Sequence, residues 1–131
     1  MIRCKRVYDP VEASDGQRVL VDRLWPRGCR KETLALTAWL RDAAPSRELR
    51  QRFHQDPSNF EAFRQAYERE LAAHPEYWQA LLAPARDGLL TLLFAARDLQ
   101  HNNARVLAGF LEEELERAGP PSSPVCYAGE F

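Results

Sequence analysis

Most of the residues that could do chemistry lie in three short stretches, each of which directly follows an apolar segment. The stretches are Tyr8-Asp9, residues 22–28 (Asp-Arg-Leu-Trp-Pro-Arg-Gly) and residues 97–103 (Arg-Asp-Leu-Gln-His-Asn-Asn). In an open sheet of parallel strands, ligands bind in the crevice outside the carboxyl ends of the strands. If the apolar segments are parallel strands, the three stretches meet there and form one binding site.

The second stretch has the composition of an anion-binding loop. Arg23 and Arg27 carry planar guanidinium groups, which match the oxygens of a phosphate or a carboxylate. Trp25 could stack on a ring of the ligand or pack over it, and Gly28 has the backbone freedom to hold the shape of the loop. We therefore predict that Arg23, Trp25, Arg27 and Gly28 bind the ligand.

Two acidic residues adjoin this loop in the predicted arrangement. Asp22 directly follows an apolar segment, and both Asp22 and Asp9 could orient a ligand or act as a base. A structural role is the alternative for Asp22, which would pair with an arginine because an unpaired buried charge is strongly unfavourable. If the first two strands formed a hairpin, Asp9 would lie at the far edge of the sheet and drop out of the site.

The third stretch leads into a predicted helix. Asn102 or Asn103 caps it, and the free backbone N–H groups and the helix dipole at this point favour an anion. His101 could act as a general acid or base near neutral pH, or simply cap the helix. Arg97 could bind the ligand or pair with Asp98. The candidate catalytic residues are therefore Asp22, His101 and Asp9, and the additional ligand-binding residues are Arg97, Asn102 and Asn103.

Common catalytic and cofactor motifs give no further guidance. Asp9, Asp22, Asp98 and His101 are possible metal ligands, but no local spacing supports a site, so we predict no metal. The sequence contains no G-x-x-x-x-G-K-[ST], G-x-G-x-x-G, G-x-S-x-G or H-E-x-x-H motif. The cofactor therefore stays open.

The apolar segments before the three stretches predict the strands of a small sheet. Residues 2–8 and 18–22 have strand character, and residues 89–96 (Leu-Leu-Thr-Leu-Leu-Phe-Ala-Ala) indicate a central strand buried on both faces. About nine residues join the first two strands, whereas a parallel crossover usually needs about a dozen or more. This spacing alone favours a hairpin.

Helical periodicity and capping residues predict five helices. The predicted fold is a small three-layer α/β domain over residues 1–119, with a mainly parallel sheet of about three strands and flanking helices, followed by an irregular tail over residues 120–131. The expected helices are one bearing Leu36, Trp39, Leu40 and Ala43; one capped by Ser46; one opened by a capping box at Ser58–Glu61; one from Pro75 to Asp87; and one from Asn102 or Asn103 to Gly119.

The composition fits one globular domain outside the membrane. The chain has 131 residues, of which 45% are hydrophobic and 28% are charged, values that are ordinary for a globular protein. No signal peptide is visible, and the longest apolar run is far shorter than the ~20 residues of a membrane span. Cys4, Cys29 and Cys126 form no C-x-x-C pair, which fits a reducing compartment. We therefore expect a cytoplasmic protein with no membrane partner.

The basic residues are unevenly divided between the two types. Sixteen arginines stand against two lysines, yet the net charge is only −1. Arginine suits phosphate and carboxylate recognition, although the codon bias of a GC-rich genome would give the same excess. The net charge weighs against nucleic acid as a partner.

Several motifs together resemble the YeaO-like family of uncharacterised bacterial proteins (domain of unknown function 488). The resemblance spans residues 1–116 and implies a compact α/β fold without an established activity. A more distant branch places a helix between its first two strands, which implies parallel strands here, and we favour this over the hairpin. That branch carries Cys-His-Arg where this chain has residues 101–103, which argues against a thiol-based mechanism. The matching motifs are C-K-R-V-Y-D-P (4–10), S-D-G (14–16), R-V-L-V-D-R-L-W-P-R-G (18–28), A-P-S-x-x-L-R (44–50), L-T-L-L-F-A-A-R-D (90–98) and H-N-N-A-x-V-L (101–107).

These observations leave two main functional hypotheses. The first is an enzyme or sensor that acts on a small anionic metabolite, such as a nucleotide or phosphorylated compound, and the sequence does not decide between catalysis and binding. The second is a non-catalytic interaction or homodimerising domain in which Trp25 anchors a partner. Nucleic-acid binding is a third reading, supported only by the abundance of arginine.

Overall fold

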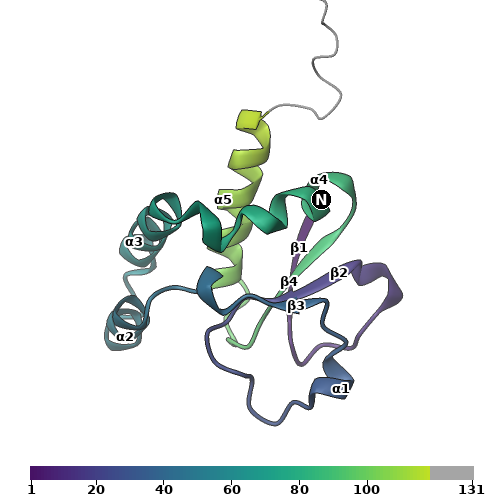
Figure 1. Cartoon of the computed structure of the whole chain (residues 1–131). Helices are drawn as coiled ribbons and strands as arrows, with labels where there is room; N and C mark the ends of the chain where they lie inside the picture. The colour runs from purple at the N-terminus through teal and green to yellow at the C-terminus, as the bar shows by residue number, and fades with distance from the viewer. Residues whose placement is uncertain (119–131) are drawn as a thin grey trace, which may run out of the picture.

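A parallel sheet of four strands forms the centre of the molecule (Figure 1). The computed structural model describes residues 1–118, and the predicted tail lies outside them. The strand order is β1-β4-β2-β3, in which β1 is Ile2–Arg6, β2 is Gln17–Leu20, β3 is Ala38–Trp39 and β4 is Leu90–Phe94. The predicted α/β class is confirmed, and the extra strand is the two-residue β3 at one edge.

The first two strands are parallel, and both pair with β4. The hairpin that their spacing favoured is wrong, and the parallel arrangement implied by the family resemblance is confirmed. Because β4 lies between β1 and β2, the link between them passes over one strand position, and it carries only the short 3₁₀ helix η1 (Ala13–Asp15). All five residues of β4 are buried, as its apolar sequence predicted.

The sheet has a large hydrophobic core on one face and a small one on the other. Val19, Leu92 and Phe94 belong to the large core, which packs against α2 to α5. Leu20 and Leu93 belong to the small core, which α1 and its flanking loop cover. Alternate residues of a strand point to opposite faces, so β2 and β4 supply both cores. The helices are α1 (Lys31–Leu34), α2 (Arg47–Gln55), α3 (Phe60–Ala73), α4 (Leu82–Asp87) and α5 (Asn103–Ala118).

The predicted helix bearing Leu36, Trp39, Leu40 and Ala43 is wrong. Ala35 adopts a left-handed backbone conformation (φ 50°) and ends α1 after about one turn. The chain then pairs with β2 as β3, and the 3₁₀ helix η2 (Arg41–Ala43) follows. Leu36 and Trp39 pack in the small core and Ala43 in the large one, so the helix-like spacing reflects two separate cores.

The other helix predictions are closer to the structure. Ser46 caps α2 by accepting from the amide of Leu49, as predicted. The cap of α3 is Asn59 and not Ser58, since the Asn59 side chain accepts from the Ala62 amide. The predicted helix after Pro75 is broken into the 3₁₀ helices η3 (Pro75–Tyr77) and η4 (Gln79–Leu81), followed by α4. Within residues 1–118, no helix is long and apolar enough to cross a membrane.

A buried ion-pair network centred on Asp15 holds the link between β1 and β2 against the neighbouring strands. Asp15 is fully buried, and its carboxylate accepts from Arg18 Nη1 at 2.6 Å and from Lys5 Nζ at 2.9 Å. The main-chain oxygen of Asp15 accepts from the hydroxyl of buried Thr91 at 2.6 Å, and Arg18 Nε donates to the Leu34 oxygen at 3.0 Å. The network therefore joins β1, β2, β4 and α1.

The turn that carries Asp15 needs a glycine. Gly16 has a φ of 65°, and a Cβ there would come within 2.2 Å of the Leu89 oxygen. The predicted Ser14-Asp15-Gly16 turn thus packs its backbone directly against the start of β4, and a side chain at Gly16 would force the two apart.

Asp15→Asn is expected to lower the free energy of unfolding at neutral pH by about 3 kcal/mol, because the buried Arg18 charge loses its partner. Burial raises the pKa of Asp15, but hydrogen bonds from Lys5, the Glu12 amide and Arg18 outweigh this effect and bring the pKa to about 2. The stabilisation is therefore complete above the ordinary aspartate pKa of about 3.9 and is lost as the pH falls toward 2.

Denaturant titrations of wild type and variant at several pH values would measure this difference. It should shrink on acidification through the range between those two pKa values. Asp87→Asn is the control, because the side chain of Asp87 is 65% exposed and its loss should change stability by about 0.5 kcal/mol or less. A difference between wild type and Asp15→Asn that does not change with pH would contradict the role assigned to the charge.

Candidate functional site

A cleft of about 450 Å³ opens at the carboxyl ends of β1, β2 and β4. The loop after β2, the connection from β4 to α5, and α2 form its walls. The convergence follows from the parallel sheet, in which the three strands end at the same edge. Of the residues predicted for the site, the cleft gathers Asp22, Arg23, Trp25, Arg27, His101, Asn102 and Asn103.

Asp22 is the one carboxylate among the described residues that line the cleft. It accepts from the Ala95 amide at 2.9 Å and from Asn103 Nδ2 at 3.1 Å. The predicted alternative, a salt bridge to an arginine, is replaced by these two amide donors. Burial raises the pKa of Asp22, whereas the two hydrogen bonds and the charge of Arg50 act in the opposite direction and offset only part of the rise.

Three arginines line the cleft together with this carboxylate. Arg23 donates weakly to the oxygens of Pro45 and Ala44, at 3.3 and 3.4 Å, and keeps other N–H groups free for a ligand. Arg27 is exposed at the rim. Arg50 comes from α2, and its Nε is buried and has no hydrogen-bond partner among residues 1–118.

Two tryptophans hold the loop that carries Arg23 and Arg27. Trp25 Nε1 donates to the Cys29 oxygen at 2.9 Å, and Trp39 Nε1 donates to the Asp22 oxygen at 2.8 Å. The two rings pack edge to face with centroids 5.2 Å apart. Gly28 has a φ of 76°, so its backbone shapes the loop as predicted, although Gly28 itself does not line the cleft.

The start of α5 forms the opposite wall. Asn102 is 2% exposed and caps the helix, because its Oδ1 accepts from the Arg105 amide at 3.0 Å. His101 is exposed and does not cap the helix. Its Nδ1 lies 3.0 Å from the Asp98 carboxylate, and its ring packs edge to face against Phe60 at 4.9 Å. This contact gives Asp98 a partner other than Arg97.

Two further predicted residues lie outside the cleft. The carboxylate of Asp9 accepts from the Arg6 amide at 3.1 Å and closes a turn after β1, so Tyr8 and not Asp9 reaches the cleft from this strand. Arg97 lines a neighbouring cavity together with Asp98. The parallel strands bring their carboxyl ends together, but the local turns after them decide which side chains point into the cleft.

The contribution of α2 to the cleft was not predicted from the sequence. Arg50, Phe53 and His54 line the cleft, and the helical spacing of Leu49 and Phe53 places Arg50 beside the buried face. The position of α2 depends on Ser46, whose amide and hydroxyl donate to the Glu70 carboxylate of α3 at 2.9 and 2.6 Å. The helical spacing was visible in the sequence, whereas the docking of α2 over the carboxyl ends of the strands was not.

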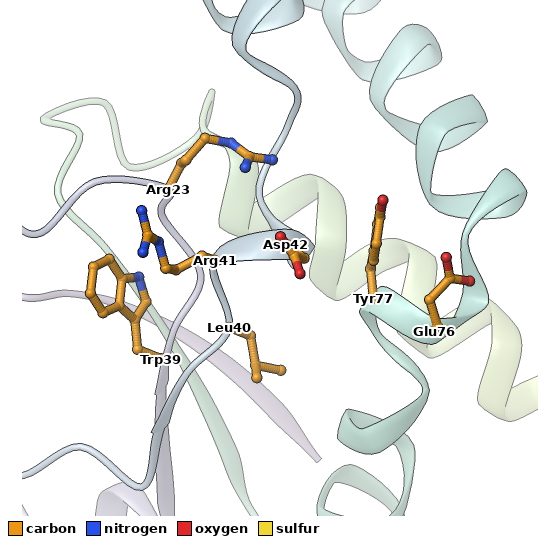
Figure 2. Close-up of a pocket in the computed structure, with 7 residues that line it drawn as sticks. All are labelled: Arg23, Trp39, Leu40, Arg41, Asp42, Glu76 and Tyr77. Atoms are coloured by element: carbon orange, nitrogen blue, oxygen red, sulfur yellow. The ribbon is translucent and has the colours of Figure 1, made fainter.

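A second cavity, of about 470 Å³, lies on the other side of Arg23. Figure 2 shows that Arg23, Trp39 and Arg41 line it from the sheet side, whereas Glu76 and Tyr77 come from η3. Arg41 packs over the Trp39 ring, with its guanidinium carbon 4.8 Å from the ring centroid. Acidic and basic residues balance in this cavity, in contrast to the strand-end cleft.

Comparison with known proteins identifies the family. A family model described as the inactive DUF488-N3 subclade matches residues 1–128. The chain belongs to the DUF488 family. It is 49% identical to the uncharacterized protein YeaO of Escherichia coli (strain K12) over 110 residues, which cover 84% of this chain and 96% of YeaO.

More distant members of the family also match over most of their length. The chain is 40% identical to the uncharacterized protein Rv3073c of Mycobacterium tuberculosis (strain H37Rv) over 114 residues, which cover 84% of this chain and 92% of that protein. No solved structure matches this chain significantly.

Asn102→Ala is expected to lower the free energy of unfolding by about 1–2 kcal/mol, because it removes the cap of α5. It also removes the donor that Asn102 Nδ2 gives to the Asp98 oxygen at 2.8 Å. His101→Ala, one residue earlier, should change it by about 0.5 kcal/mol or less because this side chain is exposed. Denaturant titrations would separate the two variants, and a larger loss in His101→Ala would reverse the assignment of the cap.

Proposed function

We propose that the strand-end cleft binds a small anionic metabolite, such as a phosphorylated compound, without converting it. The observation that carries the proposal is the buried Arg50 Nε, which has no hydrogen-bond partner in the described part of the chain. A buried donor of a charged group that lacks an acceptor is unfavourable by about 1–3 kcal/mol or more. Arg50 lines the cleft, so a small rotation of its side chain would bring Nε against an oxygen of a bound anion, which would supply that acceptor.

The charge around the cleft supports the same ligand class. Arg23, Arg27 and Arg50 surround it and oppose the single carboxylate of Asp22. Guanidinium groups bind phosphate through several parallel N–H donors. The amino end of α5, a helix of 16 residues, adds a favourable dipole. This contribution is secondary, because the side chain of Asn102 already accepts from a free amide at this end.

Two features favour binding over catalysis. The family model that matches the chain is described as inactive. In addition, the residues at 101–103 are His-Asn-Asn, where a more distant branch of the family carries Cys-His-Arg, and Asn102 and Asn103 make structural hydrogen bonds. A sensor or binding protein needs the arginines of the cleft but no nucleophile.

The second hypothesis, an interaction domain anchored by Trp25, is less well supported. The Trp25 ring packs against Trp39, and its indole N–H donates to Cys29, so the ring serves the loop itself. Leu24, which is 61% exposed at the mouth of the cleft, is the better candidate for a partner contact.

Arg50→Leu is expected to abolish thermal stabilisation by inorganic pyrophosphate and ribose 5-phosphate, because the cleft loses its buried donor. Arg27→Ala should weaken the same response. In wild type, a ligand at a hundred times its Kd should stabilise the fold by about 2.7 kcal/mol. Thermal-shift measurements on wild type and variants, with sugar phosphates, simple anions and divalent metals, would test this.

The control for these variants is Arg86→Ala. Arg86 is exposed on α4, the helix that leads into the amino end of β4, away from the cleft. It should leave the response intact. The proposal fails if no phosphate compound stabilises wild type, or if Arg50→Leu responds as strongly as wild type.

A further inference from the structure

The strand-end cleft adjoins a neighbouring cavity of about 390 Å³. Phe53, Ala96 and His101 line both, so the two lie side by side, from the arginines toward the start of α3, and are together called the groove below. The combined space is large enough for a ligand with two distinct parts, since sites for small molecules commonly measure about 300–1,000 Å³.

The second part of the groove is aromatic. Phe53 and Phe60 pack edge to face with centroids 5.8 Å apart, and His101 packs against Phe60 at 4.9 Å. Pro57 and Ala96 complete the apolar lining, and Ser58, Arg97 and Asp98 add polar groups. Aromatic rings prefer such offset and edge contacts at centroid separations of about 4.5–7 Å, so a flat ring of a ligand has matching partners here.

Asp22 sets a requirement on the part of the ligand between the two ends. Within the strand-end cleft it is the one carboxylate among the described lining residues, beside three arginines, whereas Arg97 and Asp98 line the neighbouring cavity. A bare anion would be attracted by the arginines and repelled by Asp22. A ligand that also carries a hydroxyl or amino donor would satisfy both, because a carboxylate only accepts hydrogen bonds.

We infer that the ligand is a phosphate ester that joins a hydroxyl-bearing linker to a flat aromatic ring, the chemistry of a nucleoside 5′-monophosphate. This inference rests on the proposed function, since the phosphate must bind at the arginines. His101 and Phe53 then determine specificity by contacting the ring, and Asp22 accepts from the hydroxyl groups of the linker.

Calorimetric titrations with adenosine 5′-monophosphate, ribose 5-phosphate and phenyl phosphate test the inference. The nucleotide should bind about ten-fold more tightly than ribose 5-phosphate, because stacking of a base on aromatic side chains contributes at this level. It should also bind more tightly than phenyl phosphate, which has a ring and a phosphate but no donor for Asp22.

His101→Ala should reduce the affinity for the nucleotide several-fold and reduce its advantage over ribose 5-phosphate. The chain offers a matched control in His74→Ala. His74 Nδ1 also lies 3.0 Å from a carboxylate, that of Glu76, and its ring stacks on Tyr77 at 4.6 Å, but it is outside the groove. His74→Ala should change neither affinity.

The outcomes separate the inference from the proposed function. If ribose 5-phosphate or phenyl phosphate binds as tightly as the nucleotide, the anion site stands and the inference about the ring or the linker is wrong. The inference is also wrong if His101→Ala keeps the full preference for the nucleotide. If none of the three compounds binds but inorganic pyrophosphate stabilises the fold, the inference alone fails. If pyrophosphate gives no response either, the proposed function fails with it.

Discussion

The position of the candidate site depends on the pairing of β4 with β1 on one side and β2 on the other, all three parallel. This pairing brings the carboxyl ends of the three strands together, and the polar stretches that follow them become neighbours. The ion-pair network of Asp15, Arg18 and Lys5 supports this arrangement, because it joins the short link between β1 and β2 to both strands. The candidate site lies at the carboxyl ends of the same strands.

The fold was predictable wherever a local pattern had one physical cause. The apolar run of β4 could only be a buried strand, and Ser46 and Asn102 are caps that act within one turn of their helices. The segment over residues 31–43 was not predictable, because Leu36 and Ala43 serve cores on opposite faces of the sheet and together imitate a helical period. The direction of β2 also depended on a long-range pairing that residue spacing does not contain.

In the candidate site too, residues placed by local sequence were predictable and residues placed by long-range contacts were not. Asp22, Arg23 and Arg27 were identifiable because they follow a strand directly and their loop is rich in residues that fix its shape. Arg50 was not, because its place in the cleft depends on the contact between Ser46 and Glu70 that docks α2 on α3. Tertiary docking thus supplies Arg50 Nε, the buried donor in the cleft whose missing acceptor supports the proposed role.

The most direct test of this role is an NMR titration of the ¹⁵N-labelled protein with inorganic pyrophosphate, following the side-chain Nε–H resonance of Arg50. A saturable shift of this resonance is expected as the buried donor gains an acceptor. The backbone amides at the start of α5 should shift at the same ligand concentrations. An Arg50 resonance that does not move, or shifts confined to the cavity between Arg41 and Tyr77, would show that the strand-end cleft does not bind the anion.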